Sequence, residues 1–205
     1  NVCYKCYYLP KFTTIPLFER IKRFKPRSKN DLKEAVDFWC KYKQDAIFNY
    51  GHISNWNTKY ITDMSQLFMN KTKFNDDISS WNVTNVTNMN KMFFKTESFN
   101  QSINNWNVSN VTNMSYMFCN AISFNQSLNN WNVSNVIDLN YMFYHATLFN
   151  KSLDIWDVSN VRYMNSLFNH ATNFNQNINN WNVSSVNIMT NMFRDANSFN
   201  QPLNN

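Results

Sequence analysis

Apolar and polar residues follow one pattern that recurs every 25 residues from residue 56 onward. Each copy opens with a tryptophan, and apolar residues follow at fixed later positions, written here as +2, +5, +8, +11, +12, +18 and +22. A fixed period of this length is typical of repeat architectures, in which each unit buries its apolar face against its neighbours. We therefore expect six stacked coils with a structural spine of Trp56, Trp81, Trp106, Trp131, Trp156 and Trp181.

Two shorter periods are nested within each copy. Where the second copy meets the third, Ile103, Trp106 and Val108 have the spacing of the strand segment of a leucine-rich repeat, and Trp106 and Val108 alternate with polar neighbours. The apolar residues that follow are spaced like one face of a helix: Val111, Met114, Met117, Phe118 and Ala121. The pattern therefore predicts an α/β repeat solenoid, leucine-rich-repeat-like, with one short parallel strand and one short helix in each coil.

Asparagine is abundant in the repeats, whereas the whole chain has a single glycine, Gly51. Asparagine tolerates the left-handed region of backbone conformation, so we expect it to turn the corners of the coils. The asparagines at +19 are also expected to form a ladder along the stack: Asn75, Asn100, Asn125, Asn150, Asn175 and Asn200. We interpret the methionines at +8 and +11 as gap fillers between aromatic rings, in preference to a methionine-lined groove for partners.

The first quarter of the chain is a different kind of sequence. Residues 30–55 carry an apolar stripe that includes Leu32, Val36 and Trp39, with Gly51 suited to the helix end, so we predict a helical N-terminal cap over the first coil. Three segments result: a basic N-terminal segment at 1–29, the helical cap at 30–55, and six repeats at 56–205. Because no cap follows the sixth repeat, we expect further repeats or another chain beyond residue 205.

All the net charge lies before the repeats. Residues 1–55 carry eleven Lys or Arg against five Asp or Glu, whereas residues 56–205 carry eight of each. The basic residues crowd into one run: Arg20, Lys22, Arg23, Lys25, Arg27 and Lys29. Such a run can meet an acidic protein, nucleic acid or an anionic surface, and its alternative interpretation is a solvated linker.

The sequence offers little for catalysis. No nucleophile stands with a base, and one glycine makes a phosphate-binding loop hard to build, so we predict a non-enzymatic protein without cofactors. Cys3 and Cys6 form half of a metal or redox signature, but a second cysteine pair is missing, and we expect no metal. No transmembrane stretch or signal peptide is evident. The candidate partner-binding residues on the array are those at +1, expected on the outer face of the strands: Asn82, Asn107, Asn132, Asp157 and Asn182.

The repeat unit itself resembles a known family. The stretch from Trp106 to Phe118, Trp-Asn-Val-Ser-Asn-Val-Thr-Asn-Met-Ser-Tyr-Met-Phe, is similar to the 25-residue BspA-like leucine-rich repeats, and the resemblance covers residues 56–205. It implies a non-enzymatic protein, because members of that family are surface lipoproteins and adhesins of mycoplasmas and other bacteria, or proteins of protists and giant DNA viruses. It transfers no functional residue, because the shared motif is a packing motif.

Three hypotheses follow. The first is a structural or protein-interaction repeat protein located in the virion of a large DNA virus, where other virion proteins are its partners. The second is a bacterial surface lipoprotein or adhesin that binds host protein or glycan. The third is a nucleic-acid-associated protein that acts through residues 20–29.

Overall fold

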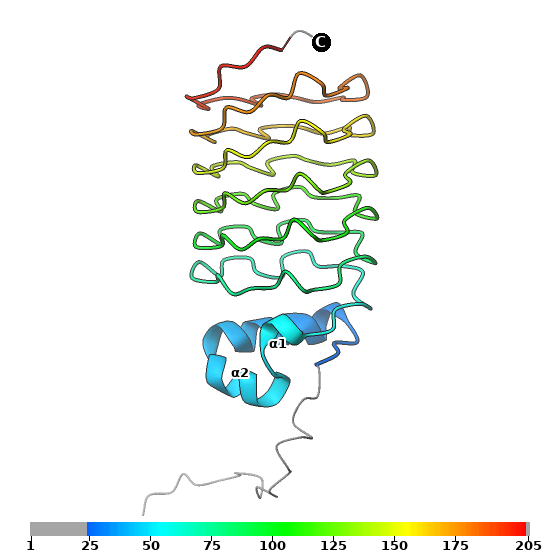
Figure 1. The fold of residues 1–205 in the computed structure, drawn as a ribbon, viewed down its shortest axis with the longest axis vertical. Helices are drawn as coiled ribbons and strands as arrows, with labels where there is room; N and C mark the ends of the chain where they lie inside the picture. Colours follow the sequence, from blue (N-terminus) through cyan, green and yellow to red (C-terminus); the bar gives the residue numbers. More distant parts are fainter. Residues whose placement is uncertain (1–23, 204–205) are drawn as a thin grey trace, which may run out of the picture.

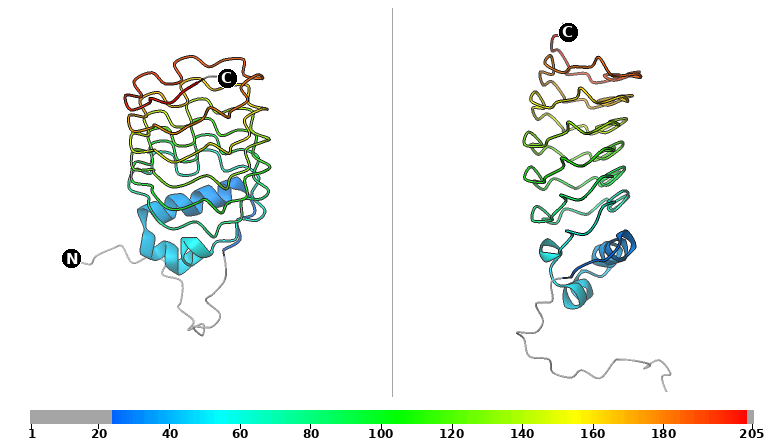
Figure 2. Two further views of the ribbon diagram at one scale, coloured as in Figure 1. Left: turned by 45° about the horizontal axis from the view of Figure 1, so that its top comes forward. Right: turned by 90° about the vertical axis from the view of Figure 1, so that its right-hand side faces the viewer.

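The computed structural model describes residues 24–203, which form a helical N-terminal part and a tall stack of coils (Figure 1). The helices are α1, Lys29–Lys41, and α2, Lys43–Tyr50, followed by the short 3-10 helix η2, Ile53–Asn55. Coil 1 begins at Trp56, and coils 2 to 6 begin at the five later tryptophans of the repeat. The views in Figure 2 show the coils lying nearly flat on one another, with α1 and α2 below coil 1.

The predicted fold class is wrong. In the described part of the chain, the coils contain neither a strand nor a helix, and no sheet is present. Among residues 24–203, the only β pairing is one isolated parallel bridge at each junction between coils. These bridges lie at +7, not in the Trp-x-Val segment: Asp63–Asn88, Asn88–Asn113, Asn113–Asp138, Asp138–Tyr163 and Tyr163–Ile188.

The strand is missing because the backbone of the Trp-x-Val segment is used within its own coil. The Trp106 N–H donates to the carbonyl of Ile103, and the Val111 N–H donates to that of Val108. These are bonds of tight turns, so a ladder between neighbouring coils cannot form there. Alternation of buried and exposed side chains therefore arises here without a strand.

The helix is missing because alternate N–H groups leave the coil. Between +8 and +15, N–H groups that donate three residues back, such as Met117 to Met114, alternate with N–H groups that donate to the next coil. Tyr116, for example, donates to the carbonyl of Asn140 at 2.8 Å. An α-helix needs each N–H to bond within its own segment, four residues back. The apolar spacing of three and four residues, which predicted a helix, therefore occurs here in a non-helical segment.

The corners of the coils are turned by residues with positive φ at +10 and +14. Every coil has both, as in Lys91 and Lys95 of coil 2, with φ of 56° and 55°. Only three of the twelve are asparagines, so our expectation that asparagine turns the corners is wrong at most positions. Since the left-handed region disfavours residues with a Cβ, the surrounding hydrogen bonds must hold this conformation in place.

A single core of stacked aromatic columns runs through the coils. All six repeat tryptophans are buried, and Trp131 and Trp156 stack with ring centroids 6.5 Å apart. Phenylalanines at +12 and +18 form two further columns that touch each other, and the ring centroids of Phe118 and Phe124 are 4.0 Å apart. The methionines at +8 and +11 are buried in coils 1 to 5, among these rings. At about 25 cal/mol/Å² and roughly 150–250 Å² per ring, each ring contributes up to about 4–6 kcal/mol.

The helices close the lower end of this core. Ser28 caps α1 by accepting from the Asp31 N–H at 3.1 Å. One face of α1 is buried against coil 1 through Leu32, Val36 and Trp39. The Trp39 indole also donates to Asp76 of coil 1 at 2.8 Å. The segment predicted as a helical cap thus extends the aromatic core by Trp39, which meets Trp56 at 5.9 Å.

The asparagine ladder at +19 is present, but it links side chain to backbone. The Oδ1 of Asn100 accepts from the N–H of Asn125 at 3.0 Å and from the Gln126 amide at 3.0 Å. The same bond to the next backbone N–H recurs from Asn75 to Asn200. The ladder therefore fixes the register of successive coils.

Candidate interaction surfaces

The basic run divides into parts with different environments. Arg20, Lys22 and Arg23 lie outside the described residues. Lys25 is exposed, and so is Arg27, whose Nε lies 3.8 Å from Asp31. These two positive side chains can meet a partner from the base of the stack.

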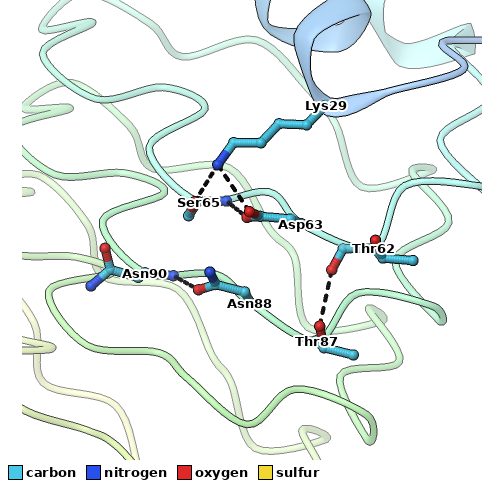
Figure 3. A network of polar contacts seen from close by, with 7 residues as sticks. All are labelled: Lys29, Thr62, Asp63, Ser65, Thr87, Asn88 and Asn90. Carbon is cyan, nitrogen blue, oxygen red and sulfur yellow. Dashed lines mark hydrogen bonds and ion pairs between the residues drawn. The ribbon is translucent and has the colours of Figure 1, made fainter.

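Lys29 has a structural role. Its Nζ lies 3.0 Å from Asp63 Oδ2 and also donates to Ser65 Oγ, so that it ties the start of α1 to coil 1 (Figure 3). Burial opposes ionisation of Asp63, but the hydrogen bonds from Ser65 and Lys29 outweigh it, and the pKa of this carboxyl is lowered. Lys29 is therefore less available to a partner than the sequence suggested.

The end of the basic run is anchored. The Phe24 ring lies 4.7 Å from Tyr50 and 5.1 Å from Trp56, and its carbonyl accepts from the Asn57 N–H at 2.8 Å. Pro26 is buried. Residues 24–29 thus pack on the cap, which argues against a solvated linker for this part of the run.

The candidate residues at +1 are exposed, as expected, but they lie in turns where a strand face was predicted. Each uses its Oδ1 to accept the N–H two residues on, as Asn132 does from Ser134 at 3.1 Å. The same turn is made by Asn82, Asn107, Asp157 and Asn182. Hydrogen bonds from Ser159 lower the pKa of the Asp157 carboxyl. These five side chains form a row of polar groups along the stack, here called the +1 row, and each is held in place by its own turn.

Another edge carries an aromatic strip that sequence reasoning missed. Tyr116 and Tyr141 stack at 4.7 Å with an interplanar angle of 8°, and Lys91 Nζ lies 5.1 Å above the Tyr116 ring. His145 and His170, at +14 of coils 4 and 5, have ring centroids 5.5 Å apart. Burial and the neighbouring Tyr141 raise the pKa of Tyr116. The signal was present at +10 and +14, where aromatic or basic residues recur in register.

A cleft of about 580 Å³ lies between α1 and coil 1. Its charged lining includes two pairs that bridge the cap and the coil: Lys43 with Asp76 at 2.5 Å, and Lys71 with Asp37 at 2.6 Å. Cys40 also lines it at the exposed mouth, and partial desolvation raises the pKa of that thiol to about 11, so it stays protonated at neutral pH. The two ion pairs across the cleft hold the cap on coil 1.

Residues 24–203 contain no group of three or more His, Cys, Asp or Glu placed to hold a metal ion. Cys3 and Cys6 lie outside the described residues. Within the same described range, no helix has both the length and the apolar character needed to cross a membrane.

Comparison with known protein families places the chain in one of them. A family model described as "Mycoplasma protein of unknown function, DUF285" matches residues 37–154 and again residues 128–205. Together these matches span residues 37–205, from the last turn of α1 through α2 and every coil, and the chain belongs to this family. No curated protein and no solved structure matches the chain.

Proposed function

We propose that the protein is a non-enzymatic scaffold that binds protein partners through the sides of its coils and through its basic N-terminal segment. The observation that supports this proposal is the repeated exposed +1 row on a backbone held by hydrogen bonds between coils. Such a surface is ordered before binding, so association loses little conformational entropy. We also propose that these repeats are related to the BspA-like leucine-rich repeats.

The row can be tested without disturbing the turns. Asp157 shows that a carboxylate makes the same turn as asparagine, so changing Asn82, Asn107, Asn132 and Asn182 together to Asp keeps the turns and alters only the surface. We expect this variant to melt normally and to lose most partners recovered by cross-linking in the source cells or particles. An unchanged partner set would contradict binding through the row.

The basic segment is tested separately, by its dependence on salt. Its positive field is screened with a Debye length of about 8 Å at physiological ionic strength. Changing Arg20, Lys22, Arg23 and Lys25 to Gln should weaken binding to polyglutamate, used as an acidic probe, and flatten its salt dependence. The matched control changes Lys91 and Lys95, on the array, to Gln. Equal losses from both sets would refute a dedicated basic site.

Two settings are proposed for this scaffold. The first is the virion of a large DNA virus, and the alternative is a bacterial cell surface, where the partner is host protein or glycan. Antibodies against the coils should label purified particles in the first setting and intact cells in the second. A third proposal, association with nucleic acid through residues 20–29, predicts binding to mixed-sequence DNA that falls steeply with salt.

A further inference from the structure

We propose that the cleft between α1 and coil 1 binds a phosphate monoester group, held by the lysines of its lining and by backbone N–H groups of coil 1 that lack an acceptor. This site goes beyond the proposed function, because it is a concave site at the base of the stack and not a surface along the sides of the coils. It uses neither the +1 row nor residues 20–25, so its failure would leave both of those proposals standing.

The cleft has the size of a ligand site. Its volume of about 580 Å³ falls within the range of roughly 300–1,000 Å³ that is usual for small-molecule sites. The last turns of α1 form one wall, and residues 70–74 of coil 1 form the other. The buried rings of Trp39 and Phe74 also line it. Because the ion pairs of Lys43 with Asp76 and of Lys71 with Asp37 join the two walls, their spacing is set before a ligand binds.

The lining carries an excess of positive charge. Four lysines line the cleft against two aspartates, a net charge of +2: Lys41, Lys43, Lys71 and Lys73 against Asp37 and Asp76. Both carboxylates already have partners. Asp76 accepts from Lys43 and from the Trp39 indole, and Asp37 pairs with Lys71 and with Lys33 of α1. The excess charge therefore lies on the two remaining lysines of the lining.

These two lysines, Lys41 and Lys73, come from opposite walls. Both are exposed, and neither makes an ion pair within residues 24–203. The Nζ of Lys41 lies 5.0 Å from the centroid of the Tyr42 ring, which leaves its charge uncompensated. The neighbouring Cys40 thiol is neutral at pH 7 and adds no negative charge. Two ammonium groups on facing walls favour an anion that bridges α1 and coil 1.

Two backbone N–H groups of coil 1 also lack acceptors on the side of the cap. In coils 2 to 6 the N–H at +17 donates to the +16 carbonyl of the coil below, as Ser98 does to Thr72, and the N–H at +19 donates to the asparagine ladder below. Below coil 1 lie α1 and α2 in place of a coil (Figure 2). The N–H groups of Lys73 and Asn75 consequently donate to no atom of residues 24–203, and Phe74 between them lines the cleft. Both donors are available to an acceptor in the cleft.

This set of donors fits a phosphate monoester better than a carboxylate. A phosphate monoester carries a charge of about −1.5 to −2 at pH 7 and three strong acceptor oxygens. That charge matches the net charge of the lining, and those oxygens can meet both ammonium groups and a backbone N–H together. A carboxylate brings one charge and two oxygens. Small phosphorylated molecules and phosphorylated side chains of proteins present the same group, and the experiment separates these two sources.

Inorganic phosphate is the first probe. Added to isotope-labelled protein and followed by NMR, it should shift the amide resonances of Lys73 and Asn75 and saturate with a Kd of about 1 mM or tighter. Amides of coils 3 to 5 should stay in place, and sodium chloride at the same ionic strength should shift neither of the two. The proposal is overturned if phosphate leaves both amides unmoved, or if chloride moves them equally.

A pair of double variants tests the lysines. Lys41→Gln with Lys73→Gln removes the uncompensated charges and should melt like the original protein, because neither lysine makes an ion pair. Loss of a hydrogen bond to a charged group commonly weakens binding by roughly 10- to 100-fold, so phosphate should bind at least about 10-fold more weakly. The matched control, Lys59→Gln with Lys95→Gln, makes the same change of charge at exposed lysines outside the cleft and should bind as the original does. Equal losses from both double variants, or no loss from the first, would overturn the site.

Further probes identify the source of the group. A short peptide with one phosphoserine is compared with its unphosphorylated twin and with glycerol phosphate. Tighter binding of the phosphopeptide than of glycerol phosphate assigns the site to phosphorylated protein partners, whereas equal or weaker binding assigns it to small phosphorylated molecules. Equal affinity for the two peptides would contradict recognition of phosphate. None of these results depends on the +1 row or on residues 20–25.

Discussion

The indole Nε1 of Trp131 donates to the carbonyl of Ile103, 28 residues earlier, at 3.0 Å. Trp106, Trp156 and Trp181 make the same bond to the +22 carbonyl two coils earlier. Trp81 makes it to the Ile53 carbonyl in η2. Each of these tryptophans therefore packs on its neighbours and also satisfies a buried carbonyl, which explains why this residue type recurs at a position where any large apolar side chain could fill the space.

This pairing predicts different effects for two substitutions. Trp131→Ala leaves a cavity and should lower the free energy of unfolding by about 3–5 kcal/mol. Trp131→Phe keeps a stacked ring but removes the indole donor, so the Ile103 carbonyl keeps only its bond from the Trp106 N–H. A loss of about 0.5–1.5 kcal/mol is expected beyond that of the smaller ring. Urea unfolding of the two variants and the original protein measures both. Equal stability of Trp131→Phe and the original would show that the indole bond contributes nothing.

Positive φ at Lys95 gives a second prediction. A β-branched residue is strained in the left-handed region, so Lys95→Val should cost about 1–2 kcal/mol. Lys95→Gly should be neutral or slightly stabilising, since glycine adopts this φ without strain. The control is Lys73→Val, at an exposed position that lacks positive φ. Thermal melting of the three variants tests the order, and similar losses from both valines would contradict it.

The asparagine ladder at +19 gives a third prediction. Asn100→Ala removes the acceptor of two hydrogen bonds, from the Asn125 N–H and the Gln126 amide. A cost of about 1–3 kcal/mol is expected, because the Asn125 N–H loses its partner. Asn105→Ala is the control, since the Asn105 side chain is exposed and has no hydrogen bond within residues 24–203. Chemical unfolding measures the difference, and a ladder without energetic value would give equal losses.

Asp138 gives a prediction about pH. It occupies the bridge position +7, and burial raises the pKa of its carboxyl above the usual 3.8, more than the hydrogen bonds from Asn140 and Ser115 lower it. The folded state then binds a proton more tightly than the unfolded chain, so this group's contribution falls as the pH rises from the unfolded value through the raised folded one. Asn113, at the same position in coil 3, shows that asparagine fits there.

Asp138→Asn keeps the Oδ1 that accepts the Asn140 N–H at 2.9 Å and removes the buried charge. The variant should be more stable than the original at pH 7, and the gain should vanish near pH 3, where the carboxyl is protonated. Melting temperatures across this range provide the measurement. A variant that is less stable at pH 7 would show that the carboxylate is favourable in its site.

The candidate surfaces were predictable only in part. The alternation around Trp106 and Val108 correctly predicted that the side chains at +1 are exposed. It did not predict the turn that fixes them, because a local Asx turn produces the same alternation as a strand. The tie between Lys29 and Asp63 and the stack of Tyr116 on Tyr141 join residues from different segments or coils. Such pairs depend on how coils are offset, which a repeat period does not specify.

The sequence by itself determined the period, the buried positions and the need for a cap, because apolar residues at fixed intervals leave few ways to remove their side chains from water. Only the tertiary structure decided the conformation of each coil. The N–H of a residue such as Tyr116 can bond within its own turn or to the coil above, and both choices bury the same side chains. Stacking selected the second, since the positive φ at Tyr116 and Asn120 directs alternate donors upward, where the next coil supplies the carbonyls.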